Sequence, residues 1–445
     1  MNKELNGKKI AVLGLGISNV AVISYLLKHD LKALGVYDTR ANPPYVDELP
    51  SGIDLHLGPL NIEELKTYDM LVVSPGLSIS MPEIAAAGKA GVEIVGDVEL
   101  FGREVTDVPI IGITGSNGKS TVTALVGYIL EKAGIPSAIG ANFGNAVFDI
   151  YSKRNQMYVL ELSSFELETT SSLHLKAGVI LNVSEDHLDR YDGSIDKYRD
   201  AKHRIFMHCD NIIVNRDDPR TFPANGHYVA SFGLDDLSYG REETPETTYL
   251  TVNGRRVLDV RELIICGRHN ELNALAAMAL ADAVGIDRNV QIEALKTFPG
   301  LEHRCQLIRE LNGVSYYNDS KATNVASAQA AIEGLCSRHP KGIILLAGGL
   351  GKGQDFTPLK RYLGKEVSAM FCFGKDADKL LCLDENYTHS VLNLRQALNS
   401  AVQMARPGQA ILLSPACASF DQFKGFEERG RVFVNLVRHL KADEE

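Results

Sequence analysis

The sequence lacks the features of a membrane-spanning, secreted or metal-clustered protein. None of its apolar runs approaches the ~20 residues that a membrane-spanning helix needs, and the polar start, residues 1–9, predicts that there is no signal peptide. The seven cysteines are scattered without a C-x-x-C pair, which argues against a zinc site and a disulfide framework. We therefore expect reduced thiols in a cytoplasmic protein.

The charge balance is acidic. A formal net charge of −10 argues against nucleic acid and a basic membrane-facing surface as partners. The length of 445 residues predicts roughly three domains, and 45% hydrophobic residues suffice for a large core. We expect a monomer whose partners are small molecules.

A glycine-rich segment is the clearest chemical signal. Residues 114–121 (TGSNGKST) follow an apolar strand, residues 108–113, and precede the helical pattern of Val122, Leu125, Val126 and Ile129. Backbone amides of such a loop, with Gly115 and Gly118 allowing close approach, bind phosphate at the helix N-terminus. Lys119 would reach the terminal phosphates, and the hydroxyl of Ser120 or Thr121 would bind magnesium.

This phosphate loop is a variant. The strict pattern places glycine six residues before the lysine, where this chain has Ile113. A glycine turn that merely caps a helix is the alternative interpretation. Because strand, loop and helix occur in order, the segment predicts a protein that handles ATP or a close relative.

The first block alternates strand (residues 9–13), glycine turn, helix (19–28) and strand (32–37), and a further strand (70–73) ends in Ser74-Pro75-Gly76. This βαβ order predicts a parallel sheet with helices on its faces. The turn has Gly14 and Gly16 of a dinucleotide fingerprint, but Asn19 stands where the third glycine is expected. Two ligands remain open: a nicotinamide dinucleotide, and a nucleotide-sugar diphosphate with Asp38, Thr39 and Arg40 near its base or ribose.

The second and third blocks repeat the alternation. Strands 157–162 and 177–182 end in polar residues that include Glu161 and His187, and ligands of such sheets gather at the carboxyl ends of strands. Residues 266–270 precede an alanine-rich helix, 271–284, on which Asn270 and Asn273 share a face. In the third block, strands 314–317, 342–346, 369–373 and 410–413 each lead into small, polar or cationic residues, which predicts a second binding rim.

With these motifs in hand, the chain resembles the Mur ligases of peptidoglycan synthesis over essentially its whole length. The most specific strings are residues 114–121, 158–165 (YVLELSSF), 185–191 (EDHLDRY), 318–324 (NDSKATN) and 413–423 (LSPACASFDQF). The last string is similar to the branch of the family that adds D-glutamate. The Asp-Asn-Pro-Arg motif of the branch that adds diaminopimelate or lysine is absent.

The resemblance implies three α/β domains. They are a Rossmann-like UDP-binding domain at 1–97, a central P-loop ATPase-like domain with a mostly parallel sheet at 98–300, and a Rossmann-like amino-acid-binding domain at 301–445. It also implies that the turn at Gly14 serves UDP. The implied activity joins D-glutamate to UDP-N-acetylmuramoyl-L-alanine through an acyl phosphate, with ATP and Mg²⁺, in the cytoplasm.

The resemblance also implies roles for particular residues. The catalytic set is Lys119, Asn142, His187 and Lys202, and the metal ligands are Ser120 or Thr121, Glu161 and His187. The ATP contacts are Gly115, Ser116, Asn117, Gly118, Lys119, Ser120, Thr121, Asn270, Asn273, Arg304, Asp319 and Lys321. The UDP contacts are Ile17, Ser18, Asp38, Thr39, Arg40, Ser74 and Gly76. The D-glutamate contacts are Thr323, Lys352, Ser419 and Phe426.

Three residues that match the family, two of them named above, have a plainer interpretation from their own chemistry. Lys202 reads as a solvated lysine on an amphipathic helix, whereas the resemblance implies a carbamate, which requires a pKa well below about 10.4. Phe426 reads as a core residue. His269 matches an adenine-side position, but a capped polar helix start explains it equally well.

Three other functions remain as alternatives. An NAD-dependent oxidoreductase would use Gly14, Gly16 and Asp38, but leaves the Lys119 loop unexplained. A non-catalytic ATP-dependent switch would use the phosphate loop for regulation. A folylpolyglutamate synthetase, or another Mur-type ligase, would share the mechanism with a different acceptor.

Overall fold

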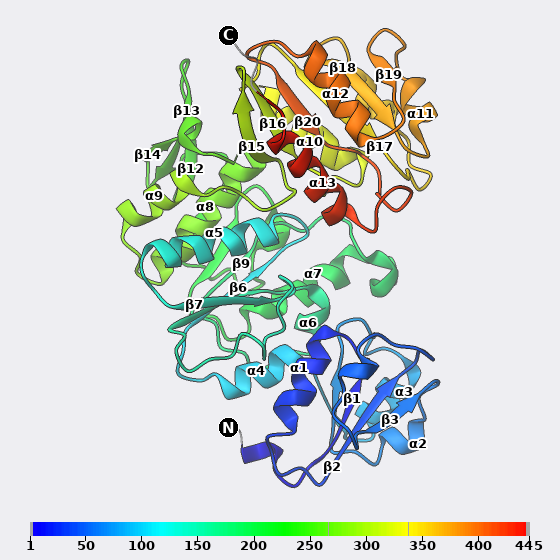
Figure 1. Cartoon of the computed structure of the whole chain (residues 1–445). Helices are drawn as coiled ribbons and strands as arrows, with labels where there is room; N and C mark the ends of the chain where they lie inside the picture. The colour runs from blue at the N-terminus through cyan, green and yellow to red at the C-terminus, as the bar shows by residue number, and fades with distance from the viewer. Residues whose placement is uncertain (1–2, 266, 337, 442–445) are drawn as a thin grey trace. The chain divides into compact units, whose positions relative to one another are not determined.

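The computed structural model describes residues 3–265, 267–336 and 338–441 (Figure 1). Contacts divide the chain into two compact units. The first comprises the residues up to Val260 together with Leu272–Leu295, and the second comprises Arg261–Glu271 together with the residues from Lys296 onwards. In the part of the chain that the structure describes, the first unit carries two sheets and the second carries one. The three-domain α/β class predicted from the sequence is confirmed, while the boundaries at 97/98 and 300/301 stay a prediction.

The first sheet has five parallel strands among the described residues, in the order β3-β2-β1-β4-β5. Its elements are β1 (Lys9–Leu13), α1 (Ile17–Leu26), β2 (Ala33–Asp38), β3 (Asp54–Leu57), α2 (Ile62–Leu65), β4 (Met70–Val73), α3 (Pro82–Lys89) and β5 (Glu93–Val95), with short turns η1 (Lys3–Leu5) and η2 (Val46–Glu48). Ile10 and Val12 of β1 pack in one cluster with Val22 of α1, while Leu13 packs in another with Ile84 of α3. Burial on both faces explains the continuous apolar runs.

The second sheet is larger and mostly parallel, in the order β14-β13-β12-β11-β10-β9-β6-β8-β7. Its strands are β6 (Ile110–Thr114), β7 (Ser137–Ala141), β8 (Met157–Glu161), β9 (Ala177–Ile180), β10 (Ile212–Asn215), β11 (Ala230–Phe232), β12 (Tyr239–Glu243), β13 (Thr248–Val252) and β14 (Arg255–Asp259). Among the described residues of this sheet, the antiparallel pairs are β12–β13 and β13–β14, and these strands are labelled in Figure 1. The phosphate-loop strand β6 lies between β8 and β9, so their polar carboxyl ends meet at one edge.

The helices of this part follow the same alternation. They are α4 (Asp97–Glu104), α5 (Lys119–Lys132), α6 (Ser164–Glu168), α7 (Ile195–His203), α8 (Arg268–Ala283) and α9 (Arg288–Thr297), with turns η3 (Leu188–Tyr191), η4 (Arg204–Phe206), η5 (Pro219–Thr221) and η6 (Val260–Glu262). Helix α5 contacts β6, β7 and β8, and its residues Val122, Leu125, Val126 and Ile129 are fully buried, as the periodicity predicted.

The third sheet has the order β15-β16-β20-β17-β18-β19, parallel except for the β15–β16 pair. Its strands are β15 (Gln306–Leu311), β16 (Val314–Asn318), β17 (Ile343–Gly348), β18 (Val367–Phe373), β19 (Thr388–Ser390) and β20 (Ala410–Leu413). Its helices are α10 (Val325–Cys336), α11 (Ala377–Leu381), α12 (Leu394–Met404) and α13 (Phe426–Arg438), with the turn η7 (Thr357–Tyr362). Two apolar clusters cover its two faces.

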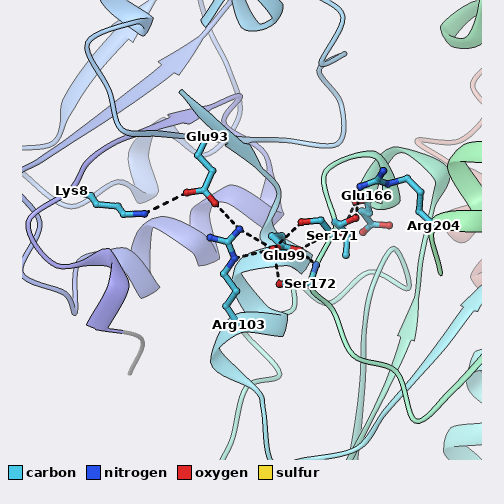
Figure 2. Close-up of polar contacts among 9 residues, drawn as sticks. Lys8, Glu93, Glu99, Arg103, Glu166, Ser171, Ser172 and Arg204 are labelled. Atoms are coloured by element: carbon cyan, nitrogen blue, oxygen red, sulfur yellow. Dashed lines mark hydrogen bonds and ion pairs between the residues drawn. The ribbon is translucent and has the colours of Figure 1, made fainter. Parts of the chain in front are cut away.

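A buried carboxylate ties the first sheet to the second within the first unit (Figure 2). Glu99 of α4 is fully buried and accepts hydrogen bonds from the backbone amides of Ser171 and Ser172 at 2.7 and 2.9 Å. Arg103 donates to Glu99 at 2.9 Å and to Glu93 of β5 at 2.7 Å. Burial raises the pKa of Glu99, but these donors outweigh it and leave the pKa below its ordinary value. The carboxylate is therefore a charged cross-link.

Candidate active site

Two glycines and a hydrogen bond to Asn182 fix the conformation of the phosphate loop. Gly115 and Gly118 have φ of +156° and +87°, conformations that favour glycine. A Cβ at Gly118 would also lie 2.6 Å from Oδ1 of Asn273, so a larger residue would collide there. Asn117 N donates to Asn182 Oδ1 at 2.9 Å, which anchors the loop to the end of β9. Ser120 and Thr121 lie half-buried in the first turn of α5, beside the backbone amides of its N-terminus.

Two lysines meet at one backbone carbonyl. Lys119 Nζ donates to the carbonyl oxygen of Gly115 at 2.9 Å and to that of Ser116 at 3.0 Å. Lys202 Nζ, from α7, donates to the same Gly115 oxygen at 3.0 Å. The fold thus brings together two predicted catalytic residues that are 83 positions apart in the sequence.

Lys202 is buried, with 1% of its surface exposed, so its interpretation as a solvated lysine is wrong. Its ammonium lies 4.4 Å from the centroid of the Tyr198 ring. Burial, followed by the nearby charge of Lys119, lowers the pKa of Lys202 to about 7. A substantial fraction of this amine is therefore neutral near neutral pH. The sequence alone could not indicate this, because the carbonyl that accepts from Lys202 belongs to Gly115, 87 positions away.

Glu161 ends β8 beside the loop, and its carboxylate is only partly satisfied. Asn142 Nδ2 donates to Glu161 Oε1 at 2.8 Å, whereas Oε2 is buried without a hydrogen-bond partner. A buried carboxylate oxygen in this state fits a hard divalent cation such as Mg²⁺. Among the described residues, no three His, Cys, Asp or Glu side chains form a complete metal site. A metal here would draw further ligands from hydroxyl, water and phosphate oxygens.

His187 begins the turn after β9 in a left-handed conformation, with φ of +51°. Its side chain is 52% exposed and lies 3.5 Å from Asp186 Oδ2. The Phe165 ring contacts it edge-on, with centroids 5.0 Å apart. The imidazole is therefore accessible to solvent, although it also contacts α6 through Phe165.

The predicted UDP residues lie around two loops at the carboxyl edge of the first sheet. A Cβ at Gly14, where φ is +86°, would lie 3.0 Å from Ser74 Cβ, so the β1 turn and the β4 loop nearly touch. Asp38, 2% exposed, accepts from Leu15 N at 2.7 Å and from Arg40 Nε at 2.8 Å. The strand order reverses between β1 and β4, which is where such sheets bind ligands. Ile17, Thr39, Arg40 and Gly76 are exposed there, and Ser18 and Ser74 are half-buried.

Asn19 replaces the expected third glycine without disrupting the turn. Its buried side chain donates through Nδ2 to the carbonyl oxygens of Leu13 and Gly14, at 3.0 and 2.8 Å. The amide thus braces the turn from within α1. The helix also begins at Ile17, two residues earlier than predicted, so the turn is shorter than the glycine pattern indicated.

In the second unit, the loop after β16 holds a buried acid beside a cation. Asp319 accepts from Ser414 Oγ at 2.7 Å and from Cys305 N at 3.0 Å, and burial raises its pKa to about 7. Lys321 Nζ lies 3.8 Å from the centroid of the Phe426 ring. Phe426 is half-buried beneath this ammonium and outside the apolar clusters, so its interpretation as a core residue is wrong. Arg304, which directly precedes Cys305, is exposed.

The remaining predicted D-glutamate residues follow β16, β17 and β20. Lys352 is exposed with φ of +51°, and its Nζ lies 5.7 Å from the Phe420 ring centroid. Ser419 is 2% exposed and Thr323 is half-buried. Sequence reasoning missed Arg429 of α13, a fully buried guanidinium that donates to the carbonyl oxygens of Ser320 and Cys417. It joins two of these loops.

The predicted adenine-side residues lie on α8. Asn270 and Asn273 are each 8% exposed, and His269 is exposed in the first turn. Asn273 packs on Gly118, as described above, so this asparagine reaches the phosphate loop. Cys266, which precedes this helix in the motif, lies outside the described residues. The six described cysteines form no disulfide with one another.

Sequence reasoning also missed a pair of buried acids. Asp97 of α4 and Glu166 of α6 are 1% and 4% exposed. Glu166 closes a capping box, accepting from Ser163 N at 2.7 Å while Ser163 Oγ accepts from Glu166 N. Burial raises the pKa of both carboxyls, and the charge of Asp97 raises that of Glu166 further. The S-x-x-E spacing of 163–166 was a readable signal for the cap.

Comparison with known proteins finds three family domains along the chain. Residues 8–96 match the family described as Mur ligase MurD-like, N-terminal domain; residues 113–281 match the Mur ligase middle domain; residues 303–417 match the Mur ligase, glutamate ligase domain. The chain is 45% identical over 440 residues to the UDP-N-acetylmuramoylalanine–D-glutamate ligase of Escherichia coli strain K12, covering 98% of this chain and 99% of that one. The same figures hold for the enzyme of that name from Salmonella typhimurium.

Solved structures share the fold at lower identity. A UDP-N-acetylmuramate-alanine ligase from Thermotoga maritima is 20% identical with a TM-score of 0.60, covering 98% of this chain and 100% of that one. A UDP-N-acetylmuramoylalanyl-D-glutamyl-2,6-diaminopimelate–D-alanyl-D-alanyl ligase from Acinetobacter baumannii is 18% identical with a TM-score of 0.62, covering 98% and 92%. The fold, the three matched domains and the full-length identity lead to one conclusion: the chain belongs to the Mur ligase family.

Proposed function

We propose that this protein is an ATP-dependent ligase that joins the amine of D-glutamate to the carboxylate of UDP-N-acetylmuramoyl-L-alanine. The observation that carries the proposal is the arrangement around the phosphate loop. Lys119 and Lys202 share the Gly115 carbonyl, and Glu161 has a buried carboxylate oxygen without a partner. The identity with D-glutamate ligases along the whole chain supports the choice of substrates.

The phosphate loop would bind ATP. The amides of residues 115–119 and the N-terminus of α5 would surround the terminal phosphates, and Lys119 would exchange its carbonyl partners for phosphate oxygens. Asn270, Asn273, Arg304, Asp319 and Lys321 are the further ATP contacts we propose. Ser120 or Thr121 and Glu161 would hold Mg²⁺, with a second near His187. When bound, the metal supplies charge neutralisation between phosphates and carboxylate.

The first chemical step is phosphorylation of the substrate carboxylate. A carboxylate oxygen attacks the γ-phosphorus, the bond to the β-phosphate oxygen breaks, and an acyl phosphate and ADP result. Asn142 would hold the carboxylate during this step, and His187 would hold the second Mg²⁺ beside it. Their role is alignment, because two anionic groups must approach in line.

Lys202 would be carbamylated. Carbon dioxide adds only to a neutral amine, and the lowered pKa of Lys202, about 7, supplies one. The product is an anion, formed next to Lys119 and available to support the second magnesium.

In the second step the amine attacks the acyl carbon, and the tetrahedral intermediate expels phosphate. Thr323, Lys352, Ser419 and Phe426 would bind D-glutamate. Lys352, as an exposed cation, suits a side-chain carboxylate, and the Ser419 hydroxyl suits a second hydrogen bond. Ile17, Ser18, Asp38, Thr39, Arg40, Ser74 and Gly76 would bind the UDP moiety. We propose that the protein acts as a monomer in the cytoplasm.

The described helices include none with the length and hydropathy of a bilayer-spanning segment.

The test is a phosphate-release screen with ATP, Mg²⁺ and the muramoyl substrate. We expect release with D-glutamate and much less with L-glutamate or other amino acids. Release that ignores both organic partners would favour an ATP-dependent switch, and release with a folate in place of the muramoyl substrate would favour folylpolyglutamate synthesis. Tight NADH binding without affinity for the UDP ligand would favour the oxidoreductase.

A further inference from the structure

Arg190 lies against the loop that follows β4. Its Nη1 donates to the carbonyl oxygen of Pro75 at 2.8 Å, and its Nη2 donates to the carbonyl oxygen of Leu77 at 3.0 Å. These carbonyls flank Gly76 and follow Ser74, two of the residues proposed to contact the UDP substrate. One side chain therefore fixes the backbone of this loop at two points.

The same guanidinium is attached to the second sheet. Nη2 also donates to Glu168 Oε2 of α6 at 2.8 Å, and the guanidinium carbon lies 4.2 Å from the centroid of the Phe165 ring. That ring supports His187 edge-on, and Arg190 N donates to the carbonyl oxygen of His187 at 3.0 Å. The contacts of Arg190 thus run from the loop at Ser74 to the turn at His187.

These contacts of Arg190 fix the position of the loop more than they stabilise the fold. The side chains of Arg190 and Glu168 are only 11% and 13% exposed, and removing such a pair from water offsets much of its attraction. A planar guanidinium makes several hydrogen bonds in fixed directions, which a lysine cannot reproduce. The Glu99 cluster of Figure 2 already cross-links the two sheets at another place. Arg190 is therefore not needed merely to join them.

We propose that Arg190 is a positioning residue that fixes the UDP-substrate loop relative to the His187 turn. By setting this distance it holds the substrate carboxylate in line with the phosphate it attacks. The guanidinium of Arg190 contacts Pro75, Leu77, Glu168 and Phe165, and none of these residues belongs to the phosphate loop. The inference rests on the proposed function for its substrate, and it names the residue that couples two parts of that site.

The test compares Arg190→Lys with a matched control, Arg256→Lys. Arg256 of β14 also pairs with a glutamate, Glu242, at 2.8 Å and lies 4.6 Å from the Tyr249 ring centroid, but it bridges no loop carbonyls. A hydrogen bond from a charged donor corresponds to about 10- to 100-fold. We expect Arg190→Lys to lower kcat/KM for the muramoyl substrate by about that factor. The KM for ATP and the melting temperature should stay near wild type, and Arg256→Lys should behave as wild type.

Two further readouts separate positioning from general damage. Guanidinium ions at tens of millimolar should restore part of the activity of Arg190→Ala and none of any loss in Arg256→Ala. Amide hydrogen exchange in residues 76–78 should be at least about tenfold faster in Arg190→Lys than in wild type. Wild-type kcat/KM in Arg190→Lys, or equal losses for ATP and muramoyl substrate without guanidinium rescue, would overturn the proposal.

The exchange measurement also separates this inference from the proposed function. If wild-type protein makes no amide product, the proposed function fails. Unchanged amide exchange in residues 76–78 of Arg190→Lys would then still refute the positioning role of Arg190, and faster exchange would still support it.

Discussion

Lys202 offers the sharpest quantitative prediction, through the substitution Lys202→Met. A difference between a pKa of about 7 in the folded chain and the ordinary 10.5 means that charging the buried amine costs about 5 kcal/mol more than in the unfolded chain. The unfolded chain keeps this proton between pH 7 and pH 9, while the folded chain releases it. Fewer protons bound in the folded state mean that stability rises with pH in this window.

The expected rise is about 2 kcal/mol in the free energy of unfolding between pH 7 and pH 9. Lys202→Met, which removes the titrating group and keeps an unbranched apolar stem, should lack this rise. Lys197→Met on the same helix is the control, because the Lys197 side chain is 59% exposed and pairs with Asp192. Urea unfolding of the three proteins at both pH values, in buffer freed of carbon dioxide, measures the difference. Parallel pH dependence in wild type and Lys202→Met would refute a depressed pKa.

The same residue should control activity. Lys202→Ala should lose turnover and regain part of it when small carboxylic acids are added, because they replace the carbamate anion. Unchanged turnover in Lys202→Ala would end the carbamate proposal.

Three further substitutions test other parts of the site. Glu161→Gln should lower kcat by about 100-fold with the KM for the muramoyl substrate unchanged, because it removes the charge of the unpartnered buried oxygen; a wild-type kcat at saturating magnesium would contradict this. Asp38→Asn should raise the KM for the muramoyl substrate about tenfold, by weakening the bonds to Leu15 and Arg40; an unchanged KM would exclude that role. Glu166→Gln keeps the cap but cannot ionise. Burial raises the pKa of Glu166, so wild type loses stability as the pH rises above about 4.3. The urea midpoint of Glu166→Gln should therefore exceed that of wild type, and the difference should grow towards about pH 8. A constant or shrinking margin would be inconsistent with that pKa.

The sequence predicted the parts of the fold that depend on local patterns. The apolar strands 9–13, 70–73 and 410–413 coincide with β1, β4 and β20, because parallel strands buried on both faces read as continuous apolar runs. The phosphate loop was equally clear, since its glycines, lysine and helix start are contiguous. Helix starts were less accurate: α8 begins at Arg268 rather than at 271, because a polar first turn does not extend the apolar period.

Contacts between distant segments were beyond such patterns. The burial of Lys202 depends on the distant phosphate loop, where its ammonium donates to Gly115, and on the Tyr198 ring of the same helix. Arg190 donates to Pro75 and Leu77, which lie more than 110 positions before it in the chain. No spacing in the sequence indicates these contacts. The place of Phe426 beneath Lys321 was hidden for the same reason, because an aromatic residue at a helix start is usually packed in the core.

The central claim is that ATP activates the muramoyl carboxylate as an acyl phosphate before the amine attacks. The most direct measurement labels that carboxylate with ¹⁸O and follows the label after turnover with ATP, Mg²⁺ and D-glutamate. The account predicts one ¹⁸O in each inorganic phosphate released, because the attacking oxygen leaves with the phosphorus. Amide product formed with unlabelled phosphate would contradict it.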